Sequence, residues 1–194
     1  MLSSIKNPVI ILYSLKNMKT LLRKSISVVL TVAVLTLATD LVQAQRRRPG
    51  TASLGEMNCQ QIKGGVYDVI NEDIPIGLEI YRAVAYLGNA RWMYESRPVQ
   101  VACRLAEPGQ KPKFKTLTLA FGLPDSLSKG ALVRLSIYKD GNFAGYKDVT
   151  AGEKLLWPIN VTNVRSIALE GECKRPSERS SECPALYFYQ DILE

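Results

Sequence analysis

From about residue 76 onward, the chain consists of short apolar runs separated by polar turn residues. In the run Leu132–Lys139, the side chains of Val133, Leu135 and Ile137 fall on one side and the remaining residues on the other. This period of two is typical of a half-buried β-strand, and no helical period is sustained. The predicted strands are 78–87, 99–105, 114–121, 132–139, a return run that ends at 149, 155–161, 164–172 and 185–193.

Turn residues support this arrangement of about eight strands. Asp140-Gly141 stands between two alternating runs, where such a dipeptide predicts a tight hairpin. Short strands with regular punctuation predict an all-β fold, a single β-sandwich or jelly roll. We assign this domain to residues 58–194. Its first part, 58–69, contains a cysteine and two adjacent glycines, which indicate an ordered turn or a short helix.

A second kind of hydrophobic pattern lies near the N-terminus. Residues 25–39 form an apolar run without a charge, preceded by Lys19, Arg23 and Lys24 and followed by small residues up to Ala44. This order is typical of a cleaved secretory signal, which we assign to residues 1–44, with Met18 as an alternative start. A membrane anchor is the competing interpretation, but spanning a bilayer takes about twenty apolar residues. We therefore expect no membrane span after cleavage.

Charge argues against a nucleic-acid partner. Removing residues 1–44 takes away five basic residues and one acidic residue, which lowers the formal charge from +7 to +3. The run Arg46-Arg47-Arg48 accounts for that remainder and lies in residues 45–57, which we interpret as a flexible basic linker. The folded part is then close to neutral, whereas a nucleic-acid binder carries a dense basic face.

All four cysteines, Cys59, Cys103, Cys173 and Cys183, follow the signal. An even number in an exported chain predicts two disulfides, and no closely spaced pair favours a zinc site, so we expect no metal. The polar segment between Cys173 and Cys183 would be closed as a surface loop by a bridge at its ends. The remaining pair, Cys59–Cys103, would tie the N-terminal segment to the sheet.

The chain contains no histidine. This excludes Ser-His-Asp and Cys-His catalysis and removes the commonest general base near neutral pH. Glu170 and Glu172 share one face of a predicted strand, which we interpret as solvated charges at a sheet edge. We therefore expect no catalytic residues, no enzyme activity and no cofactor.

Two segments resemble a known class of binding domain. Phe114–Asp125 (FKTLTLAFGLPD) is similar to a strand and corner of the carbohydrate-binding module called NPCBM, and Val133–Gly141 (VRLSIYKDG) is similar to its strand before an Asp-Gly turn. The resemblance covers about residues 81–193. It implies a galactose-binding-like jelly roll and carbohydrate binding, although the 173–183 insertion departs from the pattern.

The candidate ligand-binding residues are Arg91, Trp92, Tyr94 and Arg97, in a segment that follows a predicted strand. Sites for small ligands combine apolar or aromatic surfaces with a few polar groups that fix orientation. Trp92 has a competing interpretation as a core residue, since large aromatic side chains are mostly buried.

These features together predict an exported, non-catalytic module, secreted or located in the cell envelope, with a glycan or envelope polymer as its partner. The alternative is a structural or protein-interaction domain of the envelope without a small ligand. The sequence gives no indication of the oligomeric state.

The signal assignment predicts a mature N-terminus at Gln45, because Leu41-Val42-Gln43-Ala44 places small or branched residues at the positions that signal peptidase recognises. N-terminal sequencing of the exported protein checks this cleavage site. A mature chain that begins at Met18 or Ser25 would contradict it.

Overall fold

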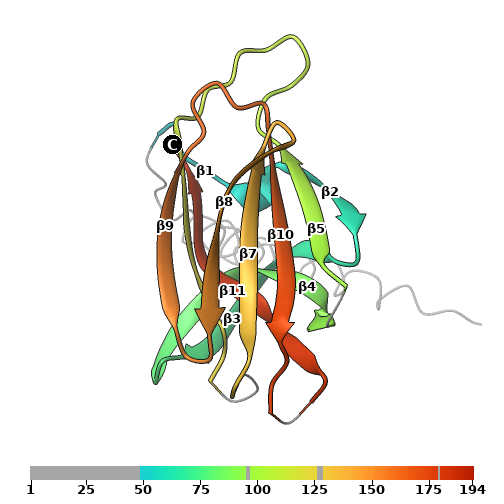
Figure 1. Cartoon of the computed structure of the whole chain (residues 1–194). Helices are drawn as coiled ribbons and strands as arrows, with labels where there is room; N and C mark the ends of the chain where they lie inside the picture. The colour runs from blue at the N-terminus through green and yellow to red at the C-terminus, as the bar shows by residue number, and fades with distance from the viewer. Residues whose placement is uncertain (1–48, 95–96, 126–128, 179) are drawn as a thin grey trace, which may run out of the picture. The chain divides into compact units, whose positions relative to one another are not determined.

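Two antiparallel sheets face each other in the computed structural model, which describes residues 49–94, 97–125, 129–178 and 180–194 (Figure 1). Sheet A has the strand order β3-β4-β11-β6-β9, with β1 paired to β11, and sheet B has the order β2-β5-β10-β7-β8. The strands are β1 (Ala52–Ser53), β2 (Asn58–Lys63), β3 (Val66–Ile76), β4 (Glu79–Tyr94), β5 (Val99–Arg104), β6 (Thr116–Gly122), β7 (Leu132–Lys139), β8 (Asn142–Thr150), β9 (Lys154–Asn160), β10 (Ser166–Arg175) and β11 (Glu182–Leu193).

The fold is therefore an all-β sandwich, as the alternating pattern predicts. The predicted signal, residues 1–44, lies outside the described residues. No described segment forms a helix that is long and apolar enough to cross a membrane.

The inner faces of the two sheets form the core. Leu135 and Ile137 of β7, Leu169 of β10 and Leu186 and Phe188 of β11 are all fully buried there. Because successive side chains of a strand point to opposite faces, each of these strands sends its apolar residues inward and leaves the intervening positions on the outer face. The core thus decides which side chains are available for a ligand.

The N-terminal part of the domain differs from the prediction in two ways. Residues 52–57 form β1 and the 3-10 helix η1 (Leu54–Glu56), not a linker, and Leu54 is fully buried in the core. Residues 58–63 and 66–76 form strands β2 and β3, not a turn or a short helix. Both are edge strands with many exposed polar side chains, so their alternation is too weak to be recognised in the sequence.

A buried carboxylate attaches this N-terminal segment to sheet A. Asp191 of β11 is 2% exposed and accepts hydrogen bonds from the Ser53 hydroxyl (2.7 Å), the Gly55 amide (3.0 Å) and the Tyr67 hydroxyl (2.9 Å). Burial, followed by the charge of Asp191, raises the pKa of Tyr67 well above its usual value, so the phenol remains a donor at neutral pH. Bonds to a buried charged group are worth more than ordinary ones.

The cysteines pair as the sequence predicts. Cys59–Cys103 joins directly opposed residues of β2 and β5, so the bridge holds the edge strand β2 on sheet B. Cys173–Cys183 joins β10 of sheet B to β11 of sheet A and closes the intervening polar loop. One bridge therefore acts within a sheet and the other between the sheets.

The two disulfides are predicted to stabilise the protein by different amounts. In the chain-entropy treatment, closing a loop with the 10-residue separation of Cys173–Cys183 contributes about 2.7 kcal/mol, and the 44-residue separation of Cys59–Cys103 about 4 kcal/mol. The double variant Cys59→Ala/Cys103→Ala should therefore unfold at lower denaturant concentration than Cys173→Ala/Cys183→Ala. Urea titrations of both variants measure the difference, and the reverse order would contradict the entropic explanation.

Candidate ligand-binding site

The predicted binding segment lies on β4, at a bulge that interrupts its pairing with β11. Leu87 pairs with Leu186 and Trp92 pairs with Pro184, so residues 88–91 lie opposite Ala185 alone. Ala90 and Arg91 both have positive φ values, 47° and 73°, which let the extra residues turn outward before the strand resumes.

Gly88 makes the bulge sterically possible. A Cβ atom at this position would lie 2.7 Å from the Cβ of Ala185 and 3.1 Å from the carbonyl oxygen of Trp92. The absence of a side chain thus allows the strand to fold back closely before Trp92. In this way the glycine determines where the aromatic residues that follow are presented.

Beyond the bulge, Met93 fixes the direction of its neighbours. Met93 is fully buried and points into the core, next to Gly171 of β10, where an added Cβ would approach its sulfur to 2.8 Å. Trp92 and Tyr94 therefore lie on the outer face of sheet A. Tyr94 is 40% exposed, and Trp92 is partly exposed and belongs to neither hydrophobic cluster. Trp92 is thus partly buried and lies outside both clusters of buried residues, and its role in ligand binding stays a prediction.

The two arginines of the predicted site take different positions. Arg91 turns toward β3, where its guanidinium donates two hydrogen bonds to the carboxylate of Glu72, at 2.8 and 2.5 Å. This bidentate pairing is the main cause of the raised pKa of Arg91. The backbone of Arg97 forms a β-bridge with Tyr94, and its amide donates to the Tyr94 carbonyl oxygen at 3.2 Å. The structure therefore places the backbone of Arg97 next to Tyr94 and directs the Arg91 side chain toward β3.

A second, smaller hydrophobic cluster covers the outer face of sheet A next to this site. Tyr86 and Tyr187 face each other across β4 and β11, with ring centroids 6.2 Å apart, and both are largely buried. Arg91 lies beside the Tyr86 ring, 6.0 Å from its centroid. Burial is the main cause that raises the pKa of both tyrosines, so their hydroxyls stay protonated at neutral pH. At 7% and 6% exposure, these two rings are too enclosed to stack on a ligand.

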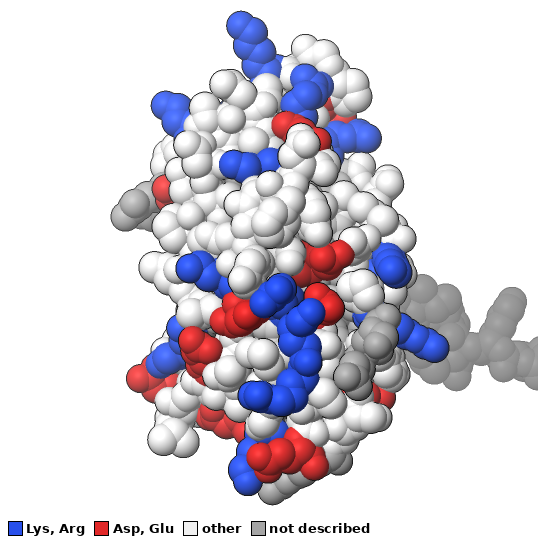
Figure 2. Space-filling view, viewed as in Figure 1, with Lys and Arg blue, Asp and Glu red and all other residues white. Residues whose placement is uncertain are grey.

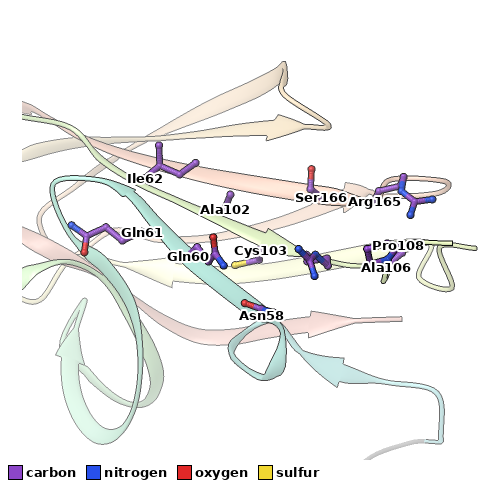
Figure 3. Close-up of a pocket in the computed structure, with 11 residues that line it drawn as sticks. Asn58, Gln60, Gln61, Ile62, Ala102, Cys103, Ala106, Pro108, Arg165 and Ser166 are labelled. Carbon is purple, nitrogen blue, oxygen red and sulfur yellow. The ribbon is translucent and has the colours of Figure 1, made fainter. Parts of the chain in front are cut away.

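Sheet B carries a groove that the sequence did not reveal. It has a volume of about 380 Å³ and follows the outer face of β5 between β2 and the start of β10 (Figure 3). Its lining comprises Asn58, Gln60, Gln61, Ile62, Ala102, Cys103, Arg104, Ala106, Pro108, Arg165 and Ser166. These residues are far apart in the sequence, and only the pairing of three strands brings them together.

The outer face of sheet B corrects one further interpretation. Glu170 and Glu172 belong to β10, the central strand of sheet B, and so do not lie at a sheet edge. The carboxylate of Glu170 accepts a hydrogen bond from the Tyr138 hydroxyl at 3.1 Å. Tyr138 in turn pairs with Phe143 across the hairpin and packs edge-on against its ring.

The aspartates near the hairpin are engaged within the protein. Asp140 accepts hydrogen bonds from the amides of Arg165 and Ser166, at 3.0 and 2.9 Å, as expected of a turn residue. Asp148 forms a bidentate pair with Arg134, at 2.7 and 2.8 Å, which is the main cause of its lowered pKa. The described residues include no group of three or more potential metal ligands.

Comparison with solved structures identifies the architecture. The chain is similar to a CBM51 module of a GH95 protein from Clostridium perfringens, solved with methyl-galactose, with a TM-score of 0.52 and 11% identity over 74% of this chain and 99% of that one. It is also similar to the CBM51 part of the Clostridium perfringens ZmpB structure that includes the M60 catalytic domain, with a TM-score of 0.50 and 12% identity over 74% of this chain and 15% of that one.

No protein-family model matches the chain, and no match was found among curated proteins. The structural similarity establishes the fold at a level of identity where sequence comparison finds nothing. The chain thus shares the fold of these two structures, and the β-sandwich predicted from the sequence is confirmed.

The close packing at the bulge predicts that a methyl group added at Gly88 destabilises the protein. Gly88→Ala should lower the free energy of unfolding by about 1–3 kcal/mol, because the new Cβ overlaps Ala185 and the Trp92 carbonyl. Denaturant unfolding measures the loss. Asn89→Ala, at an exposed position of the same bulge, is the control and should stay within about 0.5 kcal/mol of the unaltered protein. Equal stabilities of the two variants would show that the bulge tolerates a side chain.

Proposed function

We propose that this chain is an exported, non-catalytic module that binds a glycan of the cell surface or envelope through the platform formed by Trp92 and Tyr94. Arg97 flanks the platform and would supply hydrogen bonds to ring hydroxyls. Arg91 holds the bulge through Glu72 and contributes to the edge of the site. The fold of carbohydrate-binding modules supports the general class of function.

The observation that carries the proposal is the placement of two aromatic side chains on the outer face of sheet A, at the end of β4. Trp92 and Tyr94 are two residues apart on one strand, so they face the same side. Aromatic rings offer large, rigid apolar surfaces, and the Trp N–H and Tyr O–H add polar contacts at their edges. Sugars present apolar C–H faces and polar edges, which match such a surface.

The shape of the platform favours an extended ligand. Trp92 and Tyr94 line neither the groove on sheet B nor the smaller hollow beside it. An open surface buries little of a single sugar, whereas a polymer can cover both rings at once. The methyl-galactose bound to the similar CBM51 module is consistent with a hexose-containing ligand.

Two further features support export and the absence of catalysis. Disulfides persist in oxidising compartments, and both bridges of this chain join structural strands. The absence of histidine removes the commonest general base. These features agree with a module that recognises a polymer and leaves it unchanged.

The proposal predicts that Tyr94→Ala abolishes binding on a glycan array, because a 40% exposed ring contributes contact area to the ligand and little to the core. Trp92→Ala should act in the same way. The melting temperatures of both variants should stay close to that of the unaltered protein. Tyr146→Ala, with a similarly exposed ring on sheet B, is the matched control and should bind normally.

Two outcomes would oppose the proposal. A loss of about 3–5 kcal/mol in stability for Trp92→Ala would place that ring among buried side chains. An array on which the exported protein binds no glycan would instead favour a structural or protein-interaction domain of the envelope.

A further inference from the structure

The groove on sheet B owes its depth to small side chains in the middle of the sheet. Ala102 of β5 points outward, since its neighbours Val101 and Cys103 are buried in the core. It pairs with Gln60 on one side and Ala168 on the other. Ala102 therefore forms a shallow floor next to strands that carry longer side chains.

The walls of the groove offer unoccupied amides. Asn58, Gln60 and Gln61 line it from β2 (Figure 3), and no hydrogen bond within the described residues engages their side-chain amides. An amide side chain both donates and accepts hydrogen bonds, as does each hydroxyl group of a sugar. Ile62 contributes an exposed apolar surface at one end.

The charged side chains that line the groove are all basic. Arg104 and Arg165 line it, and none of its described lining residues is acidic. This excess is local, because acidic and basic residues balance over residues 49–194 as a whole. Figure 2 shows lysine and arginine side chains at the end of the molecule that carries the 105–115 loop. The smaller adjoining hollow shares Asn58 and Arg104 with the groove and is lined by both charges, Lys111 and Lys113 together with Glu56 and Glu107.

Arg165 is held in place without losing its charge. Its guanidinium donates to the backbone carbonyl oxygens of Glu107, at 3.0 Å, and Gln110, at 3.3 Å, which are neutral acceptors. Arg104 pairs with the Glu107 carboxylate at 3.2 Å, with both side chains about half exposed. Such exposed pairs contribute about 0–1 kcal/mol, so an incoming anion can replace Glu107 at little cost.

We propose that this groove is a second carbohydrate site, selective for an acidic oligosaccharide. A sugar carboxylate would contact Arg104 and Arg165, and the hydroxyls of the adjoining residues would lie over Ala102 against the amides of β2. Guanidinium groups suit carboxylates because they present paired donors in one plane. The proposal rests on the proposed glycan-binding function but uses the sheet opposite to the Trp92–Tyr94 platform. No aromatic ring lines the groove, so charge and amide contacts, not stacking, would determine its affinity.

Calorimetric titration of the exported protein with trigalacturonate tests this site. We expect binding that weakens as salt increases and that falls at least tenfold with the methyl-esterified trisaccharide, which keeps the hydroxyls and lacks the charge. Ala102→Leu fills the floor and Arg104→Gln removes a cation, and each should lower the affinity at least tenfold. Ala144→Leu, at an exposed position of β8, makes the same change outside the groove and should bind normally.

The variants distinguish this proposal from the proposed function. Tyr94→Ala should leave trigalacturonate binding unchanged, because the platform belongs to the other sheet. The melting temperature of each variant checks that it is folded. If Ala102→Leu does not fold, Arg104→Gln still tests the groove, because it alters only an exposed side chain. Absence of trigalacturonate binding, equal affinity for the ester, or normal binding by both groove variants would overturn the groove proposal. Array binding that depends on Tyr94 would still support the platform.

Discussion

The contact between the inner faces of the two sheets is the constraint on which the rest of this structure depends. A domain of this kind buries one face of each sheet, and the pleat then sends every second side chain to the outside. Leu135, Ile137 and Leu169 are fixed by this packing, but Tyr138 and Glu170 next to them lie on the outer face. The outer positions are therefore free to carry recognition chemistry without affecting the core.

The sequence predicts the sandwich best where strands are central and regular. The strands β5, β7 and β10 alternate clearly because one of their faces is buried along most of its length. The strands β2 and β3 were missed because they lie at sheet edges, where solvent accepts polar side chains on both faces. Residues 52–57 were assigned to a linker because their attachment depends on Asp191, which is more than a hundred residues away.

The candidate sites differ in how much the sequence reveals of them. Aromatic residues next to arginines are visible as a local motif, and the structure places Trp92, Tyr94 and Arg97 together. It also places Arg91 on Glu72, a contact between strands that spacing alone does not indicate. The groove has no local signal at all, because its floor is a single alanine and its cations come from the ends of two different strands. Pairing register, not composition, creates it.

The position of the last strand has a consequence for how the chain acquires its structure. β11 lies at the centre of sheet A, between β4 and β6, and also carries Cys183 and Asp191. Until residues 182–193 are available, β4 and β6 have no common neighbour, the bridge between the sheets has no partner, and β1 has no strand to pair with. Such long-range pairing makes folding slow. Sheet B and its bridge Cys59–Cys103 contain no residue of this last strand, so they can form before sheet A and the bridge between the sheets are completed.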